Sequence, residues 1–160
     1  MTGTLVFDSL FSGDEEGNPT PERGLAESWE VSDDGLLYTF HLRDGIKWHD
    51  GEPFTAEDVV FTYHAIAAPG YMGRNYSRGM QNIVGAEEVK NGEAEEISGI
   101  TIEDDLTFTV EMKEALATNE VELNITPIAK HIFEGLAPEE MANLNRDPIG
   151  TGAFIFEDYA

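Results

Sequence analysis

The sequence predicts an α+β fold in which antiparallel β-hairpins pack against helices. Two segments alternate apolar and polar residues on both sides of an acidic turn. A third segment changes from the two-residue period of a strand to the three- and four-residue period of a helix. The chain has 160 residues, of which 41% are hydrophobic, and this is enough to bury a core. We therefore expect residues 1–160 to form a single domain.

The charge balance excludes several classes of partner. Nine Lys and Arg residues against 32 Asp and Glu residues give a net charge of −23, which would repel nucleic acid and an anionic membrane surface. No apolar run approaches the ~20 residues that cross a bilayer, so we expect no direct membrane insertion. The absence of cysteine excludes disulfides, thiolate catalysis and cysteine-bound metals.

The N-terminal segment predicts a short element followed by a loop. Residues 3–11 (GTLVFDSLF) are mainly apolar, whereas residues 13–24 (GDEEGNPTPERG) are polar and rich in turn-forming residues. The acidic composition of this loop is not a calcium signature, because the glutamate that should close a calcium loop starting at Asp14 falls at Leu25.

Residues 28–43 (SWEVSDDGLLYTFHLR) predict the first hairpin. An Asp-Gly step readily adopts the positive φ angles of a tight turn, so we place residues 34–35 at its centre. This register sets Val31 opposite Tyr38 and Trp29 opposite Phe40, and it gathers the aromatic side chains on one buried face.

The segment FTAEDVV predicts the start of a helix. Thr55 is suited to cap the helix with its hydroxyl, and Asp58 stands at the third helical position, as in a capping box. Phe54 and Val59 have the spacing of a hydrophobic staple. We expect the helix to reach about residue 67, since the Pro-Gly step at 69–70 would end it.

Residues 97–113 (ISGITIEDDLTFTVEMK) predict the second hairpin. A two-residue turn at 104–105 would split the apolar residues between the two faces of the sheet. A three-residue loop at 103–105 keeps them together, with Ile102 opposite Leu106 and Ile100 opposite Phe108, and we favour it for that reason. We expect Ile102 and Phe108 to be buried.

Three further stretches have weaker patterns. Residues 70–92 mix Gly, Arg and aromatic residues without a period, and predict a long loop with a short helix near its end. Residues 125–143 predict a short helix, and residues 147–160 predict a strand.

No catalytic or metal site is evident in the sequence. His49 and Asp50 are neighbours on a predicted turn, where adjacent side chains rarely face each other, and no serine stands in a nucleophile-elbow context. The four histidines are widely scattered and HExxH is absent. We expect no enzyme activity, no metal and no cofactor, and we interpret the turn at 49–51 as scaffold. The rival hypothesis is that the protein is a hydrolase. Assays with a panel of peptidase and esterase substrates would distinguish a hydrolase from a binding protein.

The order of the segments resembles the family 5 solute-binding proteins of ABC importers, the receptors for oligopeptides, dipeptides, nickel and related solutes. Residues 24–63 are similar to the signature region of that family, and residues 97–115 to the strand pair that follows it. Residues 128–133 (IAKHIF) resemble its Pro-Lys-His segment, and residues 148–154 (PIGTGAF) its Gly-Thr-Gly-Pro-aromatic segment. Two departures concern a pocket wall: Ala153 replaces the usual Pro, and residues 115–126 lack the Pro-aromatic pattern of the family.

The resemblance implies that the chain is a fragment of the N-terminal lobe of a two-lobed, periplasmic-binding-protein-like fold, without the second lobe. In such receptors two lobes close on the solute. The loop after the capped helix is then the part expected to touch ligand, through Arg74, Tyr76 and Met80, with Arg for a carboxylate and Tyr for stacking or hydrogen bonding. A solvent-exposed loop without a ligand is the alternative for the same residues.

The resemblance also implies a function: to capture peptides or a related small solute outside the membrane and deliver it to permease subunits of the importer. The location would be extracytoplasmic, as a periplasmic protein or a cell-surface lipoprotein. Since the sequence shows no signal peptide before Thr2, we expect that the leader of such a protein is not included in it. The alternative is an acidic surface interaction module with no role in small-molecule transport.

Overall fold

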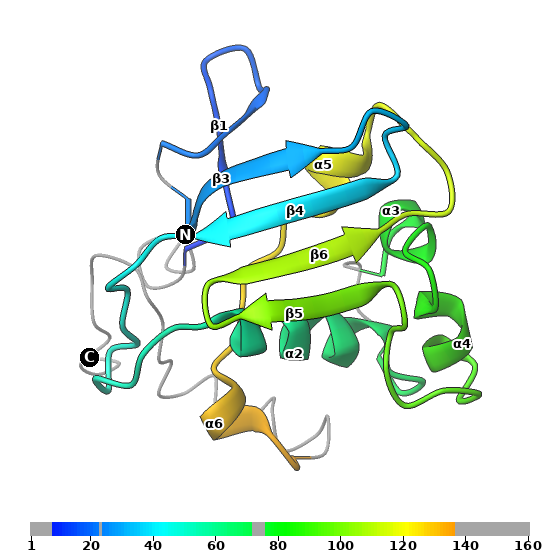
Figure 1. Cartoon of the computed structure of the whole chain (residues 1–160). Coiled ribbons are helices and arrows are strands. Elements are labelled where there is room, and N and C mark those ends of the chain that lie inside the picture. Colours follow the sequence, from blue (N-terminus) through cyan, green and yellow to red (C-terminus); the bar gives the residue numbers. More distant parts are fainter. Residues whose placement is uncertain (1–7, 23, 72–75, 137–160) are drawn as a thin grey trace.

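The computed structural model describes residues 8–22, 24–71 and 76–136, which form helices packed on one face of an antiparallel sheet (Figure 1). The strands are β1 (Ser12–Gly13), β2 (Pro19–Thr20), β3 (Ala26–Val31), β4 (Leu37–Leu42), β5 (Ile100–Asp104) and β6 (Thr107–Glu111). The helices are α2 (Ala56–Ala67), α3 (Arg78–Gln81), α4 (Ala86–Lys90), α5 (Asn119–Glu122) and α6 (Lys130–Phe133). The predicted α+β class is confirmed.

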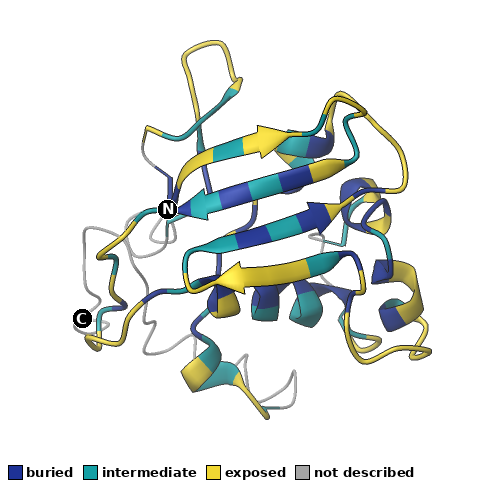
Figure 2. Cartoon of the chain, in the orientation of Figure 1, coloured by how far each residue is buried: buried dark blue, intermediate teal, exposed yellow. Residues whose placement is uncertain are grey.

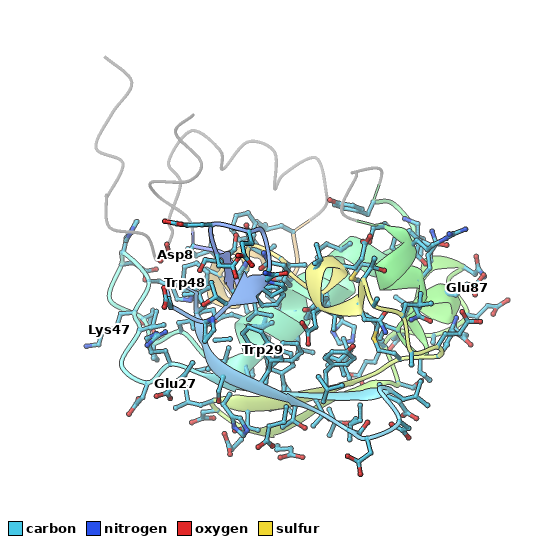
Figure 3. All side chains as sticks on the ribbon, turned by 90° about the horizontal axis from the view of Figure 1, so that it is seen from above. Asp8, Glu27, Trp29, Lys47, Trp48 and Glu87 are labelled. Atoms are coloured by element: carbon cyan, nitrogen blue, oxygen red, sulfur yellow. The ribbon has the colours of Figure 1, made fainter. Side chains whose placement is uncertain are left out.

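The main sheet has the strand order β3-β4-β6-β5, with every neighbouring pair antiparallel. Each predicted hairpin supplies two adjacent strands, and β4 joins them by pairing with β6. The helices α2, α3 and α4 lie between the two hairpins in the chain. In Figure 3 the helices lie on one side of the sheet, and Trp29 and Trp48 are on that side.

The register of the first hairpin is confirmed, since Trp29 pairs with Phe40 and Val31 with Tyr38. Its turn differs from the expectation. The carbonyl oxygen of Ser32 accepts a hydrogen bond from the N–H of Gly35 at 2.8 Å, so residues 33–34 occupy the centre of the turn.

Local hydrogen bonds explain this turn. The carboxylate of Asp34 accepts bonds from the Ser32 hydroxyl and, at 3.1 Å, from the N–H of Leu36. Asp34 therefore keeps a negative φ angle, and Gly35, with φ of 72°, supplies the left-handed conformation that brings the chain back.

The expected register of the second hairpin is wrong by two residues. Ile102 lies opposite Phe108 rather than Leu106, and Ile100 lies opposite Val110. The apolar residues of the two strands nevertheless share one face, because residues directly opposite each other point to the same side of a sheet.

A β-bulge, not a three-residue loop, keeps those apolar residues in phase. Asp104 pairs with Thr107 across a two-residue turn, and the pairing shifts between Ile102 and Asp104. The extra residue in the bulge restores the alternation that a two-residue turn alone would have reversed. The carboxylate of Asp104 supports the turn by accepting the N–H of Leu106 at 2.9 Å.

Figure 2 shows buried residues along the two central strands, β4 and β6. The core lies between the sheet and α2 and is centred on stacked aromatic rings. The ring centroids of Phe40 and Phe108 are 5.1 Å apart, and that of Tyr63 on α2 is 6.4 Å from Phe108. Phe40 and Phe108 are fully buried as expected. Trp29 was also expected to be buried but is only half-buried, packed against the core from the edge strand β3. Ile102 is 39% exposed, contrary to expectation, because β5 is an edge strand.

Helix α2 begins and ends where the sequence predicts. Thr55 and Asp58 form a capping box, in which the Asp58 carboxylate accepts the N–H of Thr55 at 3.0 Å. The staple residues Phe54 and Val59 are both buried. The last helical residue is Ala67, two positions before the Pro-Gly step.

The remaining segments contain more structure than expected. The predicted N-terminal loop forms the short β1–β2 ladder, and residues 70–92 contain two short helices, α3 and α4. The short helix predicted within 125–143 is α6, whereas the strand predicted at 147–160 lies outside the described residues. None of the described helices is both long and apolar enough to cross a membrane.

Candidate functional site

The turn at His49-Asp50-Gly51 connects the sheet to α2. The carbonyl oxygen of Trp48 accepts the N–H of Gly51 at 2.9 Å, and the N–H of Trp48 donates to the carbonyl oxygen of Glu52 at 2.8 Å. Gly51 has φ of 93°, a conformation that favours glycine. This backbone pattern is that of a closed turn, in agreement with the scaffold interpretation.

Asp58 fastens this turn to two other elements. Its buried carboxylate accepts hydrogen bonds from the indole Nε1 of Trp48 at 3.2 Å and from the N–H of Thr55 at 3.0 Å. The other carboxylate oxygen accepts the N–H of Lys130, at the start of α6, at 2.8 Å. One side chain thus joins the turn, the N-terminus of α2 and the N-terminus of α6.

His131 of α6 brings an imidazole to the same corner. Its Nε2 lies 2.6 Å from Oδ2 of Asp50, and it must be the donor because an ionised carboxylate only accepts. Partial burial acts to raise the pKa of Asp50, but the hydrogen bonds from His131 and from the N–H of Glu52 outweigh it and hold that pKa below its ordinary value. Asp50 is therefore an anion that attracts α6.

A shallow cavity of about 270 Å³ opens beside this pair. It is lined by Glu52, Pro53, Thr55, Glu57, Asp58, Lys130, His131 and Glu134. Two side chains of the lining have structural roles, since Thr55 caps α2 and the Lys130 ammonium pairs with Glu57 at 3.1 Å. These contacts join α2 and α6 at a structural junction. Nowhere in the described ranges do three His, Asp or Glu side chains gather to hold a metal ion.

The predicted ligand-binding residues fall in different environments. Arg74 lies outside the described residues. Tyr76 is half-buried at the surface, and the ammonium of Lys90 lies 4.8 Å from its ring centroid. Partial burial, with the negative charges of Glu87 and Glu88, raises the pKa of Tyr76, so its hydroxyl keeps its proton and is available as a donor.

Met80 does not offer a surface to a ligand. Its side chain has 0% exposure and belongs to the hydrophobic core. It lies on α3, whose N-cap Ser77 accepts the N–H of Met80 at 3.4 Å. The burial of Met80 corrects the expectation of direct contact and makes it a support for the short helix that follows Tyr76.

A second depression, of about 470 Å³, lies between α3, α4 and the segment after β6. It is lined by Arg78, Gln81, Asn82, Glu87, Lys113, Glu114 and Leu116. The side chain of Asn82 is fixed by bonds to the backbone of Glu114 and to the buried Asn119. Lys113 pairs with Glu87 at 3.1 Å, so the depression is polar and of mixed charge.

Sequence reasoning missed two contacts between segments that are distant in the chain. His131 and Asp50 are 81 positions apart, and neither carries a local signal of the other. Lys90 is the last residue of a short helix, and its contact with Tyr76 depends on how α4 packs beside α2. Only the resemblance of residues 128–133 to a family segment marked the neighbourhood of His131.

Comparison with known proteins gives consistent matches. The family model described as "Bacterial extracellular solute-binding proteins, family 5 Middle" matches residues 20–160. Heme-binding protein A of Haemophilus influenzae is 34% identical over 155 residues, which cover 91% of this chain and 28% of that protein. The dipeptide-binding protein of Escherichia coli K12 is 33% identical over 152 residues, which cover 85% of this chain and 26% of that protein.

A solved structure agrees with these sequence matches. The crystal structure of Haemophilus influenzae OppA in complex with the peptide RPPGFSPFR superposes with a TM-score of 0.79 at 27% identity. The superposition covers 98% of this chain and 31% of that one. The chain thus spans between about a quarter and a third of the length of these proteins.

Proposed function

This chain belongs to the bacterial extracellular solute-binding proteins of family 5, and from that membership we propose that it is part of the substrate-binding component of an ABC importer. The observation that carries the proposal is the family match over residues 20–160, together with the superposition on a peptide-binding relative. Membership favours this role over that of an acidic interaction module. The role is binding, not catalysis, and the structural contacts of the His49–Gly51 corner support that choice.

The proposed solute is a peptide or a related small molecule. Relatives are named for dipeptides and for heme, and the superposed OppA holds a peptide. On this chain we assign the solute contact to Tyr76, whose protonated hydroxyl can donate to a carbonyl or carboxylate oxygen. We also propose that Arg74 binds a carboxylate group of the solute. Met80 supports α3 from within the core.

The proposed partners and location follow from the same membership. We infer that the solute is delivered to ABC permease subunits and that the chain acts outside the cytoplasm, in a periplasm or as a cell-surface lipoprotein. The net charge of −23 disfavours binding to nucleic acid and to anionic lipid surfaces.

The chain is proposed to form one lobe of a two-lobed receptor and to supply one wall of the solute site. Its relatives are more than three times as long as the part that matches. Small-ligand sites bury about 70–90% of the ligand surface, which a single open wall does not provide. The remaining length of such a protein would supply the opposite wall and the closure that excludes water.

Calorimetry on the longest natural gene product that contains this sequence tests the proposal. We expect binding to one or more peptides of two to five residues. Tyr76→Phe should weaken that binding, whereas Tyr71→Phe is the matched control, because it also removes one tyrosine hydroxyl from the same surface. If no peptide binds, the proposed solute is wrong. If both variants bind as the unmodified protein does, the proposed role of Tyr76 is wrong.

A further inference from the structure

Lys90, the last residue of α4, places its ammonium group at the C-terminal end of α2. Its Nζ atom donates hydrogen bonds to the carbonyl oxygens of Ala68, at 3.0 Å, and Tyr71, at 2.6 Å. Carbonyl groups at the end of a helix lack intrahelical donors and carry partial negative charge, so a cation is stabilised there. Lys90 thus fixes the chain as it leaves α2.

The same ammonium also lies over two aromatic rings. Nζ is 4.8 Å from the ring centroid of Tyr76 and 5.8 Å from that of Tyr71, both within the range of a cation–π interaction. An ammonium group has three N–H donors. Two of them point at the carbonyl oxygens, which leaves the third for the nearer ring, that of Tyr76.

This set of partners is unusual for a cation in so acidic a chain. The ion pairs of the described residues are formed by Lys113, Lys130 and His131, and Lys90 is not among them. Glu87 and Glu88 precede Lys90 on the same helix, yet its ammonium faces carbonyl groups and rings. Its position is therefore set by the two segments that it joins.

We propose that Lys90 is a positioning residue for solute binding, which holds the ring of Tyr76 against the end of α2 and ties it to Tyr71. This inference rests on the function proposed above, because Tyr76 is the described residue that we assign to the solute. The ammonium lies over the ring of Tyr76, and this half-buried residue keeps part of its surface accessible to a ligand. Lys90 itself does not touch the solute.

Nuclear magnetic resonance on the 160-residue chain tests the contact directly. In the unmodified chain, the ring current of Tyr76 should move the ε-methylene protons of Lys90 upfield, and this shift should become clearly smaller in Tyr76→Leu, where only the more distant ring of Tyr71 remains. Lys90→Met removes the charge and should change the ring resonances of Tyr76, whereas Lys90→Arg keeps a cation and should preserve them. Unshifted ε-methylene protons in the unmodified chain would overturn the proposal, even if Lys90→Met failed to fold.

Calorimetry on the longest natural gene product that contains the chain tests the consequence for binding. Loss of the two cation–π contacts and the two hydrogen bonds of Lys90 should weaken solute affinity by about three- to tenfold in Lys90→Met, and Lys90→Arg should retain most of the affinity. Equal affinities for the unmodified protein and Lys90→Met would refute the positioning role. If the unmodified protein binds no solute, the proposed function fails, while the resonance experiment still decides whether Lys90 holds Tyr76.

Discussion

The indole Nε1 of Trp48 donates a hydrogen bond to the carboxylate of Asp58 at 3.2 Å, and both side chains are buried. Asp58 also accepts the N–H groups of Thr55 and Lys130, so three donors depend on one carboxylate. The contact therefore joins the turn that contains Trp48 to helix α2.

Asp58→Asn should therefore destabilise the chain. The amide has one acceptor oxygen instead of two, and its NH₂ group would face a donor, at a cost of about 2–3 kcal/mol in the free energy of unfolding. Urea unfolding followed by circular dichroism is the measurement. Glu57→Gln, an exposed neighbour that loses only a surface ion pair, is the control and should change stability by less than about 1 kcal/mol. Equal effects of the two variants would contradict the role given to Asp58.

The N-terminal cap of α2 makes a smaller, separate contribution. Thr55→Ala removes the hydroxyl of the capping box and should cost about 1 kcal/mol, while Thr55→Ser keeps a hydroxyl and should cost much less. Thermal melts of Thr55→Ala that overlay those of the unmodified chain would refute the cap.

The corrected register of the second hairpin predicts unequal effects at two opposite residues. Phe108 has 0% exposure and stacks on Phe40, so Phe108→Ala should cost about 3–5 kcal/mol. Ile102 lies opposite it but is 39% exposed on the edge strand, so Ile102→Ala should cost clearly less than the 2–5 kcal/mol that is typical of a core isoleucine. Comparable destabilisation by the two substitutions in urea would show that β5 is covered in solution.

His64 predicts a loss of stability in mild acid. Its Nε2 accepts the N–H of Ile97 at 2.9 Å, and burial, opposed by the charge of Glu96 and a bond to Val60, holds its pKa below the ordinary 6.5. The imidazole is neutral in both states above that pH, where its contribution is complete. As the pH falls below 6.5, the unfolded chain takes up the proton first, and stability declines until the folded pKa is passed.

Urea unfolding between pH 7.5 and 5.5 measures this effect. The free energy of unfolding should decrease as the pH is lowered in the unmodified chain. The decrease should be less steep in His64→Gln, which keeps an acceptor for the N–H of Ile97 but does not titrate. Parallel pH profiles for the two proteins would show that His64 is not the group responsible.

The 160-residue chain by itself is expected to bind no peptide measurably. A micromolar complex needs about 8 kcal/mol, and association first loses ~4–15 kcal/mol of translational and rotational free energy. A single open wall with Tyr76 at its surface offers too few contacts to offset this loss. Calorimetry against peptides of two to five residues is the check, and micromolar binding by the isolated chain would show that it carries a complete site.

Local signals made the main elements predictable. The register of Trp29 with Phe40 follows from alternation across a short turn, and the cap of α2 follows from Thr55 and Asp58, three positions apart. The bulge of the second hairpin was not predictable, because the two-residue turn with a bulge and the three-residue loop put the same apolar residues on the same face. Pattern alone cannot choose between them.

The candidate site was less accessible to sequence reasoning. Met80 stands in a stretch without a period, where an apolar residue fits a pocket wall as well as a core. The contacts of His131 with Asp50, and of Lys90 with Tyr71 and Tyr76, join segments whose approach is fixed only by the packing of α2, α4 and α6. Such pairs carry no spacing that a single sequence reveals.

The strand order β3-β4-β6-β5 has a consequence for how the chain folds. Each hairpin closes locally, but the seam between β4 and β6 pairs residues 37–41 with residues 107–111 and requires closure of a long loop that contains α2, α3 and α4. Loop-closure entropy makes distant strand pairing the slow step in chains of this kind. Two preformed hairpins should therefore dock late, and substitutions in the β4–β6 seam should slow folding more than substitutions in either turn.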